Sequence, residues 1–569
     1  MEPAIQRPWL NSYPKDVPKH IDYDEKPLND YLSNAAENAP GQKAIHFLGK
    51  ELTYREVYES ALKLANHLIS RGLEKGDRVS IMLPNCPQAV IGYYGVLLAG
   101  GIVVQTNPLY MERELEHQLN DSGARFILCL DLVFPKVVKV KSNSPIEHII
   151  VTGLKEYLPF PKNVLYPLVQ KKQKTGILVN VPYNDTSIHS FKEWMRTGIL
   201  DKPEVSINPK EDLALLQYTG GTTGLAKGVM LTHYNLVVNT MQCRYWIADA
   251  RFGEEVILGI LPFFHVYGMT CVMNLAIMYQ SKMVILPRFD AKDTLKTISK
   301  QRPTLFPGAP TIYISLLNHP DLDDYDLSSI KACISGSAPL PVEVQQKFQE
   351  KISGRLVEGY GLTEASPVTH ANLLSGKNVT GSIGLPWPDT DAAILGAEGK
   401  PAETKEIGEL LVRGPQVMKG YWNLPQETEA VLNDGWLSTG DMGYMDEEGY
   451  FYIVDRKKDM IIAGGYNIYP REVEEVLYEH DAIQEAVVLG VPDPYRGETV
   501  KAFIVLKEGC TVQEEDLNKH CRKHLAAYKV PRLYEFREEL PKTTVGKILR
   551  RVLIDEEKQR FEDASSHSV

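Results

Sequence analysis

Tyr218-Thr-Gly-Gly-Thr-Thr-Gly-Leu-Ala-Lys-Gly228 is the stretch of this sequence that best indicates its fold and its chemistry. Its glycines allow the backbone to approach an anion closely and to point N–H groups at it. Thr219, Thr222 and Thr223 add hydroxyl donors, and Lys227 adds a positive charge. The stretch therefore predicts a loop that binds phosphate groups.

This loop differs from the common phosphate-binding loop, in which Gly-Lys-Ser/Thr ends the turn and opens a helix. Two residues separate Gly224 from Lys227, and a glycine follows the lysine. We therefore expect a triphosphate held in a geometry that does not transfer its γ-phosphoryl group. Taken alone, the loop is also compatible with a Gly/Thr-rich turn between two strands.

Size and composition limit the class of protein. A chain of 569 residues is too long for one hydrophobic core, so we expect a large domain and at least one smaller domain. The net charge of −11 argues against nucleic acid as a partner, because phosphate neutralisation needs a basic face. The seven cysteines contain no C-x-x-C pair, which fits a reducing cytosol.

Hydrophobic periodicity in the first half of the chain alternates between strands and amphipathic helices. A capping box at Thr53–Glu56 opens a helix that Gly72 ends. Further strands are expected at 79–83, 102–104, 126–130 and 148–151, with helices at 88–99 and 112–121. This alternation predicts parallel sheets covered by helices on both faces.

Two uncharged runs and one polar segment need separate interpretation. Prolines interrupt the runs at 79–111 and 256–281, so we interpret both as buried strand and helix units rather than as membrane spans. The segment 155–203 is weakly patterned, and we expect a surface connection there. The tail from Asp563 is expected to be disordered.

The composition changes at Asp455-Arg-Lys-Lys-Asp459, and a compact α+β pattern follows. Helices are expected at 470–479 and 511–525, strands at 486–489 and 500–506, and a last helix from Gly546. We therefore place a domain boundary at Lys458, which divides the chain into residues 1–457 and 458–569.

Several further segments carry side chains that suit nucleotide chemistry. Trp436-Leu-Ser-Thr-Gly-Asp441 puts an acid on a tight turn, where a carboxylate can accept hydrogen bonds from a diol. The others are Glu358-Gly-Tyr-Gly-Leu-Thr-Glu364, Pro541-Lys-Thr-Thr-Val-Gly-Lys547 and Leu261-Pro-Phe-Phe-His-Val-Tyr-Gly268. Each has a plainer interpretation: a turn cap, a solvated lysine, or a core histidine at position 265. Their joint order and spacing along the chain favour nucleotide chemistry over these plainer interpretations.

Five motifs, in chain order, resemble the adenylate-forming superfamily of acyl-CoA synthetases, carrier-linked adenylation domains and luciferases. They are the phosphate loop, Gly359-Tyr-Gly-Leu-Thr-Glu364, Thr439-Gly-Asp441, Asp455-Arg-Lys-Lys-Asp459 and Lys542-Thr-Thr-Val-Gly-Lys547. The similarity extends from about Leu28 to Arg551. Residues 434–458 resemble the fatty acyl-CoA synthetase signature, and Trp9-Leu-Asn-Ser-Tyr-Pro14 and Asn107-Pro-Leu-Tyr110 are similar to bacterial long-chain fatty acid–CoA ligases. Ser438 departs from the pattern, since many fatty acyl enzymes have histidine there, and this leaves the chain-length class open.

The resemblance implies an α/β fold. A large N-terminal domain would combine parallel-type sheets covered by helices with a β-barrel-like subdomain, and a small mobile α+β domain would rotate about Lys458. It implies that ATP activates a carboxylate as acyl-AMP with release of pyrophosphate, and that the thiol of CoA then displaces AMP. ATP, Mg²⁺, CoA and a fatty acid are the implied ligands. Cytoplasmic location is expected, and peripheral contact with the inner face of the membrane and homodimerisation stay open.

The resemblance also implies roles for individual residues. Residues for the β- and γ-phosphates are Thr219, Gly220, Gly221, Thr222, Thr223, Gly224 and Lys227. Residues around adenine and the α-phosphate are Gly336, Ser337, Ala338, Glu358, Gly359, Tyr360, Gly361 and Thr363. Asp441 and Arg456 would hold the ribose, and Glu364 with Thr219 would coordinate Mg²⁺. Lys547 would stabilise the pentavalent transition state, Glu364 and His265 join it as catalytic candidates, and Lys458 is the hinge.

The segment expected to line the acyl site excludes one class of substrate. No acid lies between Leu261 and Ile285, so a substrate ammonium would be buried without a partner. The apolar and small residues that suit an apolar slot are Val266, Met269, Val272, Met273, Gly308, Ala309, Gly381 and Gly384. Because each buried methylene contributes about 0.8 kcal/mol, we expect a medium- to long-chain fatty acid.

Alternatives to a fatty acid–CoA ligase stay open at this point. A fatty acyl-AMP ligase, or a CoA ligase for aryl or medium-chain acids, shares the first half-reaction. A luciferase-type oxygenase, a nucleotide-binding regulatory protein and a phosphotransferase are further alternatives, each with a different product.

Overall fold

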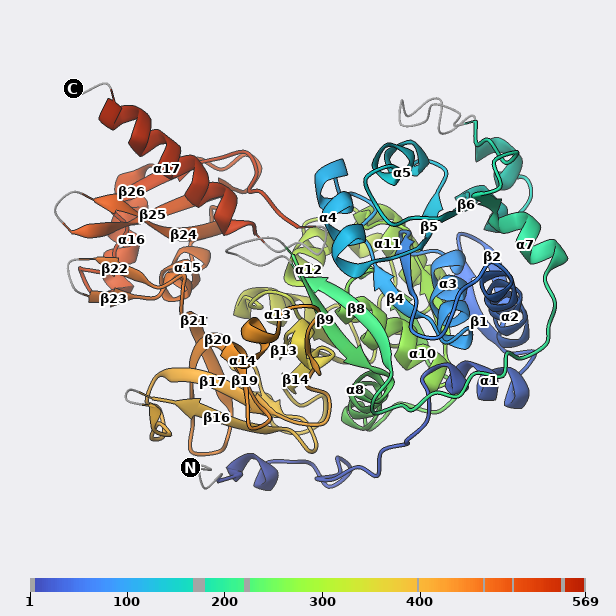
Figure 1. Cartoon of the computed structure of the whole chain (residues 1–569). Coiled ribbons are helices and arrows are strands. Elements are labelled where there is room, and N and C mark those ends of the chain that lie inside the picture. Colours follow the sequence, from blue (N-terminus) through green and yellow to red (C-terminus); the bar gives the residue numbers. More distant parts are fainter. Residues whose placement is uncertain are drawn as a thin grey trace.

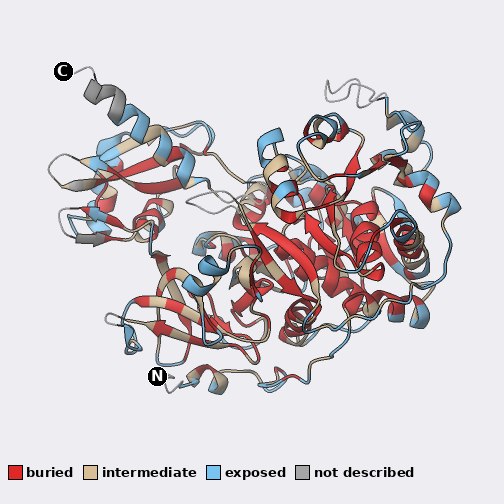
Figure 2. Ribbon diagram, viewed as in Figure 1, coloured by how far each residue is buried: buried red, intermediate tan, exposed pale blue. Residues whose placement is uncertain are grey.

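The structure is a computed structural model that describes residues 6–166, 180–219, 226–396, 399–463, 466–493, 496–543 and 548–566. Three regions follow one another along the chain in Figure 1: a large region of mixed sheets and helices, an antiparallel sheet, and a small domain that ends in a long helix. Buried residues concentrate in the central sheets of the large region (Figure 2).

An eight-stranded sheet forms one layer of the large region, in the order β18-β9-β8-β4-β3-β5-β6-β7. All of its neighbouring pairs from β8 to β7 are parallel, whereas β9 is antiparallel to both β8 and β18. Its strands are β3 (Arg78–Met82), β4 (Ile102–Gln105), β5 (Phe126–Leu130), β6 (His148–Thr152), β7 (Ile188–Ser190), β8 (Leu213–Thr219), β9 (Lys227–Thr232) and β18 (Gly420–Tyr421). The predicted parallel pattern is confirmed.

Two four-stranded sheets lie deeper in the same region, in the orders β10-β11-β1-β2 and β12-β13-β14-β15. Isolated bridges through Leu305 connect Ile257 of the first sheet to Ala332 of the second. The strands are β1 (Lys43–Phe47), β2 (Lys50–Thr53), β10 (Val256–Gly259), β11 (Lys282–Ile285), β12 (Ala332–Ser335), β13 (Arg355–Gly361), β14 (Val368–Ala371) and β15 (Leu385–Pro386).

Helices cover these sheets. The capping box predicted at Thr53 and Glu56 opens α2 (Tyr54–Ser70), which packs on α3 (Pro87–Leu98). Every residue of α3 is buried, as expected for a helix covered on all sides. The remaining helices of the region are α1 (Asn29–Asn38), α4 (Glu112–Ser122), α5 (Phe134–Lys141), α7 (Phe191–Thr197), α8 (His233–Trp246), α9 (Val266–Gly268), α10 (Leu275–Met278), α11 (Ala291–Gln301), α12 (Pro310–Leu317) and α13 (Val342–Gln349). Short helices are η1 (Pro8–Asn11), η2 (Leu154–Tyr157), η3 (Met269–Asn274), η4 (Leu322–Asp324) and η5 (Thr363–Ala365).

A five-stranded antiparallel sheet forms the barrel-like subdomain that the resemblance predicted. Its strands are β16 (Asp391–Leu395), β17 (Gly408–Arg413), β19 (Leu432–Asn433), β20 (Trp436–Met445) and β21 (Phe451–Arg456), with α14 (Pro425–Val431) beside them. The N-terminal segment runs along this sheet (Figure 1), where Arg7 pairs with Asp391 and Trp9 packs edge-on against Phe451.

The small domain is the predicted α+β unit. It has the strand order β23-β22-β25-β24, with β26 parallel to β25. Its elements are β22 (Ile461–Ala463), β23 (Tyr466–Ile468), α15 (Pro470–Tyr478), β24 (Ile483–Asp493), β25 (Gly497–Leu506), α16 (Glu514–His524), β26 (Leu533–Phe536) and α17 (Arg550–Ser566). A hydrophobic core of its own includes Ile461, Val473, Leu477, Ile504 and Leu517.

Three local expectations were wrong. The segment 155–203 is more than a surface connection, because β7 extends the large sheet and α7 buries Phe191 and Trp194. Asp441 lies inside β20, opposite Arg456 of β21, rather than on a tight turn. Helix α17 continues to Ser566, past the point where disorder was expected to begin.

The two uncharged runs form strand and helix units, as expected. No helix in the described part of the chain combines the length and apolar character that a bilayer crossing needs.

Candidate active site

One cleft of about 2530 Å³ contains every described residue that the sequence singled out for nucleotide chemistry. The large region contributes Thr219, Lys227, His265, Gly336, Ser337, Ala338, Glu358, Gly359, Tyr360, Gly361, Thr363 and Glu364. Asp441 and Arg456 of the antiparallel sheet and Lys458 also line it. Gly220 to Gly224 and Lys547 lie outside the described residues. Segments more than two hundred positions apart in the sequence therefore meet around one space.

The two ends of the phosphate loop are neighbouring positions in a hairpin. β8 and β9 are antiparallel, and Thr219 pairs in register with Lys227. The described ends of the stretch, Thr219 and Lys227, both line the cleft. The Lys227 ammonium lies 2.5 Å from a Glu427 carboxylate oxygen and 5.1 Å from the centre of the Tyr421 ring.

Asp441, the acid predicted to hold the ribose, is enclosed. Its side chain is 8 % exposed, and one carboxylate oxygen accepts the hydroxyl hydrogen of Tyr360. The other oxygen lies 3.2 Å from Nε of Arg456, which the β20–β21 register places directly opposite. The carboxylate therefore faces the cleft between an aromatic hydroxyl and a guanidinium.

The position of Tyr360 follows from the backbone of β13. A side chain at position 361 would clash with the neighbouring strand, because its Cβ would lie 2.2 Å from the Pro367 carbonyl oxygen. Glycine therefore permits this close backbone approach. The Tyr360 ring packs edge-on against His370, with ring centres 5.9 Å apart. Burial, followed by the charge of Asp441, raises the pKa of Tyr360 well above its ordinary value. Its hydroxyl therefore stays a donor at neutral pH.

Glu364 lies in the short helix η5 and is held by a tyrosine that the sequence argument missed. The Tyr421 hydroxyl donates to a Glu364 carboxylate oxygen at 2.8 Å. Burial and the Glu364 charge raise the pKa of Tyr421 well above its usual range, so this hydroxyl keeps its hydrogen at neutral pH. Tyr421 lies in β18, next to β9, and so links Glu364 to Lys227. No local sequence pattern indicates this pairing.

On the opposite wall, the 336–338 turn and the His265 segment lie close together. A Cβ at Gly336 would lie 3.0 Å from the Tyr267 ring, so glycine permits this approach. Ser337 has a positive φ of 71°. His265 is half-buried, and its Nδ1 accepts the Tyr267 backbone N–H at 3.4 Å, which caps α9. His265 thus has a structural contact and also lines the cleft.

Residues 32–422 match the family model of the AMP-binding enzyme, and residues 472–547 match the model of the AMP-binding enzyme C-terminal domain. The chain belongs to the AMP-binding enzyme family.

The adenylate-forming resemblance and the fold expected from it are therefore confirmed. This AMP-binding enzyme is 61 % identical over 557 residues to a long-chain-fatty-acid–CoA ligase of Bacillus subtilis, with 97 % of this chain and 98 % of the relative covered. Among solved structures, it is similar to the anthranilate CoA ligase AuaEII in complex with anthranoyl-AMP, with 28 % identity, a TM-score of 0.83 and coverage of 96 % and 99 %.

A third relative was solved in two states. The ATP-bound MatB of Rhodopseudomonas palustris matches with a TM-score of 0.81 at 28 % identity, covering 93 % of this chain and 99 % of its own. Apo MatB, with the same coverage, matches with a TM-score of 0.72.

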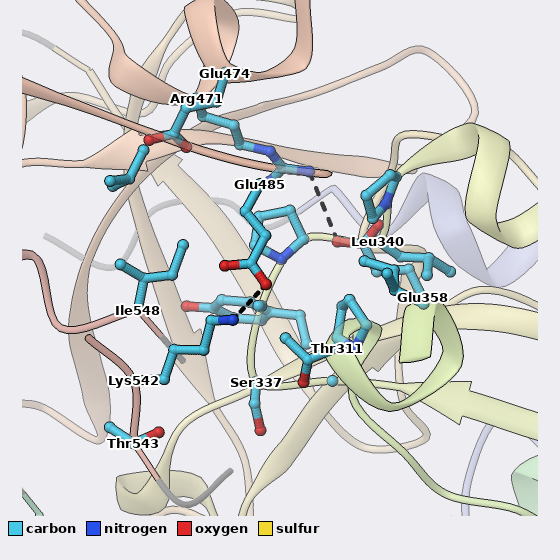
Figure 3. Close-up of a pocket in the computed structure, with 18 of the residues that line it drawn as sticks. Thr311, Ser337, Leu340, Glu358, Arg471, Glu474, Glu485, Lys542, Thr543 and Ile548 are labelled. Carbon is cyan, nitrogen blue, oxygen red and sulfur yellow. Dashed lines mark hydrogen bonds and ion pairs between the residues drawn. The ribbon is translucent and has the colours of Figure 1, made fainter. Parts of the chain in front are cut away.

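Residues of the small domain line one part of the cleft (Figure 3). Thr543 and Ile548, which precede and follow residues 544–547 in the sequence, line the cleft together with Ser337 and Thr311. Lys542 forms an ion pair with Glu485 of β24.

Glu358 faces the small domain of the AMP-binding enzyme. Its side chain is 7 % exposed, and a carboxylate oxygen lies 3.7 Å from Nη2 of Arg471 in α15 (Figure 3). Burial raises the pKa of Glu358 to about 7, although the Arg471 charge opposes this shift. Arg471 also donates through Nη1 to the Ile453 carbonyl at 2.8 Å. No sequence pattern pointed to the contacts of Arg471 with Glu358 and Ile453, because both lie in other elements.

Of the residues predicted for an acyl slot, Gly381 is exposed at the cleft, and the others are buried. The buried ones are Val266, Met269, Val272, Met273, Gly308, Ala309 and Gly384. A small cavity of about 20 Å³ lies behind Ile334, between two thiols and several aliphatic side chains; its lining is Cys243, Ile247, Cys271, Leu275, Leu305, Pro307, Ala332 and Ile334. Ile334 lines both this cavity and the cleft. Tyr267 braces the same wall by donating to the Ile334 carbonyl at 2.7 Å.

Proposed function

We propose that this enzyme is a long-chain fatty acid–CoA ligase, which converts a fatty acid, ATP and CoA into acyl-CoA, AMP and pyrophosphate. The observation that carries this proposal is the 61 % identity to the Bacillus subtilis long-chain-fatty-acid–CoA ligase over almost the full length of both chains. The cleft supports it, because the cleft brings an enclosed acid, a second acid, a lysine and the turn at residues 336–338 to one space.

The chemistry requires two steps because a carboxylate is a poor electrophile. In the first step, a carboxylate oxygen attacks the α-phosphorus of ATP and the bond to pyrophosphate breaks, which leaves acyl-AMP. In the second step, the sulfur of CoA attacks the acyl carbon, the thiol proton is lost, and the bond to AMP breaks. Phosphotransfer would instead release ADP.

The positions of the side chains suggest how ATP is held. Asp441 and Arg456 hold the ribose, Tyr360 stacks on adenine beside Gly336, Ser337 and Ala338, and Thr363 contacts the α-phosphate. The phosphate loop, between Thr219 and Lys227, holds the β- and γ-phosphates. In the structure, Tyr360 and Arg456 hold the Asp441 carboxylate in place, whereas Lys227 pairs with Glu427 and would exchange that contact for a phosphate oxygen.

The donor set near the loop fits a magnesium ion. Glu364 offers a carboxylate and Thr219 a hydroxyl, and both line the cleft. Mg²⁺ prefers oxygen ligands and commonly uses one or two protein oxygens together with substrate phosphates. When bound, it would offset phosphate charge; Glu364 is kept in place for this by the Tyr421 hydroxyl.

We place the boundary between the two domains at Lys458, with rotation of residues 458–569 between the half-reactions. The two hydrophobic cores support this position: the last buried member of the large core is Phe451, and the first of the small core is Ile461. Lys547 would stabilise the pentavalent transition state and then leave with its loop. Thr543 and Ile548, on both sides of that loop, line the cleft.

The acyl chain would extend past His265 and Ile334 toward the small apolar cavity. A cavity of about 20 Å³ is too small for the alkyl chain of a fatty acid. Tyr267 and Ile334, which separate it from the cleft, must therefore move before the alkyl chain can enter. Each methylene that is buried there would contribute about 0.8 kcal/mol, which favours long chains.

We also propose a cytoplasmic enzyme that touches membranes peripherally to collect its substrate. The seven cysteines are all free, which suits a reducing compartment. Phe160, Val164 and Leu165 are 81 %, 63 % and 48 % exposed beside the exposed Lys162. This mixture suits an interfacial contact. Sedimentation with anionic vesicles would detect it, and sedimentation equilibrium would show whether the enzyme is a homodimer.

The decisive experiment follows the nucleotide product. The purified chain is given Mg-ATP, CoA and a series of acids from acetate through decanoate to palmitate, with benzoate as the aryl comparison. We expect AMP, pyrophosphate and thioester, with kcat/KM rising with chain length. ADP would overturn the proposal. A preference for acetate or benzoate would move it to another acid class, and acyl-AMP without thioester would indicate a fatty acyl-AMP ligase.

A further inference from the structure

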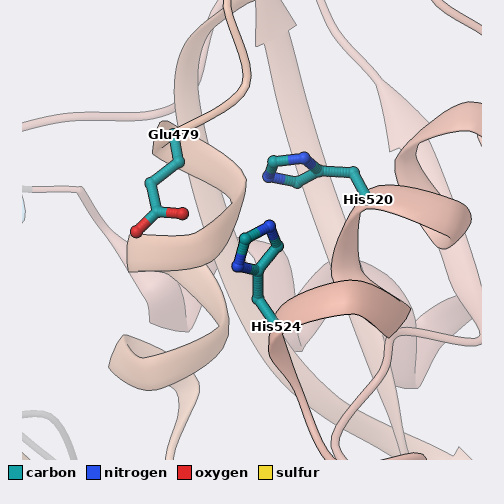
Figure 4. Close-up of side chains that lie close together, drawn as sticks. All are labelled: Glu479, His520 and His524. Atoms are coloured by element: carbon teal, nitrogen blue, oxygen red, sulfur yellow. The ribbon is translucent and has the colours of Figure 1, made fainter.

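The small domain contains a cluster of metal-ligating side chains away from the nucleotide groups. Glu479 is the C-cap residue of α15, and His520 and His524 lie on α16. One ligand atom from each residue lies within 4.8 Å of those of the other two (Figure 4). Among the residues that the structure describes, this is the one group of three or more such side chains that meets this distance limit. We propose that it binds a divalent transition-metal ion of the zinc class.

The helix spacing explains why the two histidines converge. Residues four positions apart lie one above the other on the same face of a helix, so His520 and His524 face the same way. Their rings lie 5.1 Å apart, centre to centre. Glu479 approaches from the neighbouring helix, which packs against α16. The cluster is therefore formed by two helices and exists only in the folded small domain.

The ligand set selects the class of ion. Two imidazoles and one carboxylate match zinc sites that have three protein ligands and a water in the fourth position. Imidazole suits Zn²⁺, Ni²⁺ and Cu²⁺, whereas Mg²⁺ and Ca²⁺ prefer oxygen ligands alone. Glu479 and His524 are exposed and His520 is half-buried, so an ion can enter from solvent. This site would thus differ in metal preference from the magnesium site proposed in the cleft.

One histidine is already held by a contact typical of metal ligands. His520 Nε2 lies 2.8 Å from the Val476 carbonyl oxygen of α15. With Nε2 donating its hydrogen to that carbonyl, Nδ1 keeps the free lone pair of a neutral ring. Ligating histidines usually donate their other N–H in this way, which fixes the ring and strengthens the ligand.

The C-termini of α15 and α16 lie beside the cluster and favour a bound cation electrostatically. Glu479 caps the C-terminus of α15, and His524 is the last residue of α16. Helix C-termini carry partial negative charge and attract cations. Arg522 and Lys523 oppose this attraction, but the Arg522 guanidinium is directed to Asn518, one turn back, at 2.7 Å. An ion here would join α15 to α16 and so stabilise the small domain.

The test measures the ion directly on the full chain, without a histidine tag and after removal of metal by a chelator. Equilibrium dialysis against Zn²⁺ should give one ion per chain, and Zn²⁺ should raise the melting temperature because it binds only the folded state. His524→Gln and His520→Gln should each weaken binding by at least ~10-fold, since even the loss of a supporting contact costs about 10–100-fold.

His480→Gln is the matched control. Its ring packs at 5.3 Å from His520, but it lies outside the ligand set and its Nδ1 accepts the Ala482 N–H. This variant should bind Zn²⁺ like the unchanged chain. Co²⁺ should give visible absorption without a thiolate charge-transfer band. Such a band, which exposed Cys510 could produce, would overturn the proposal. So would unchanged binding in His524→Gln, equal loss in His480→Gln, or no bound ion.

Discussion

Asp441→Asn tests the proposed nucleotide site most directly. The substitution keeps the shape of the side chain and one acceptor oxygen but removes the negative charge. Asp441 is 6 % exposed and sits between the Tyr360 hydroxyl and the Arg456 guanidinium. An enclosed carboxylate of this kind should form strong hydrogen bonds to the hydroxyls of a ribose.

The size of the effect follows from these contacts. A hydrogen bond to a charged group contributes ~1.5–3 kcal/mol, and the amide in the variant would lose about one such contact. At about 1.4 kcal/mol for each factor of ten, kcat/KM for ATP should fall about 10–150-fold. The KM for the fatty acid should stay nearly unchanged, because Asp441 is not part of the acyl slot proposed beside His265 and Ile334.

The assay is pyrophosphate exchange into ATP at saturating fatty acid, with the melting temperature measured in parallel. Glu447→Gln is the matched control, because it removes the same charge from the same hairpin. Glu447 is exposed and pairs with Lys405 at the surface, at 2.9 Å, so activity should stay within about twofold. A normal kcat/KM for ATP in a folded Asp441→Asn protein would refute the proposed ribose contact.

Three further predictions concern the other groups of the cleft. Lys547→Ala should slow acyl-AMP formation about 10²–10³-fold yet still convert supplied acyl-AMP to thioester; equal loss of both half-reactions would contradict the assignment. Chelation of Mg²⁺ by EDTA should abolish pyrophosphate exchange, and Glu364→Gln should raise the Mg²⁺ concentration needed to restore it; an unchanged Mg²⁺ requirement would argue against Glu364 as a ligand. Glu358→Gln should flatten the dependence of the melting temperature on pH. Burial raises the pKa of Glu358 from 4.5 to about 7, so the folded chain keeps a proton that the unfolded chain has lost, and stability falls as pH rises through that window. The same dependence of the melting temperature on pH in both proteins, between about pH 5 and pH 8, would refute this.

Much of the local structure could be predicted because its signals are local. The capping box at Thr53 and the apolar stripe behind it define α2, since both depend on residues a few positions apart. The parallel strands of the large sheet that have four or five residues appear in the sequence as apolar runs between helices, so the sequence pattern predicts them. The family could be recognised because several chemical motifs occur in a fixed order along the chain.

The sequence indicated less about partners that are distant along the chain. Tyr421 supports Glu364, and Arg471 faces Glu358, yet neither pairing has a local pattern. Asp441 was expected on a turn because Thr-Gly-Asp is typical of turns, but cross-strand pairing with Arg456 extends β20 through it. The strand β7 was missed because an edge strand of three residues has too few side chains to show periodicity.

The sequence by itself therefore determined which chemistry this protein carries: a phosphate loop, two acids and a late lysine, in the order of one enzyme family. The tertiary structure decided how those groups meet, with Tyr421 on Glu364, Arg471 on Glu358, and Glu479 beside two histidines of another helix. The reason is physical: helix and strand propensities act over a few residues, whereas these contacts depend on how whole elements pack.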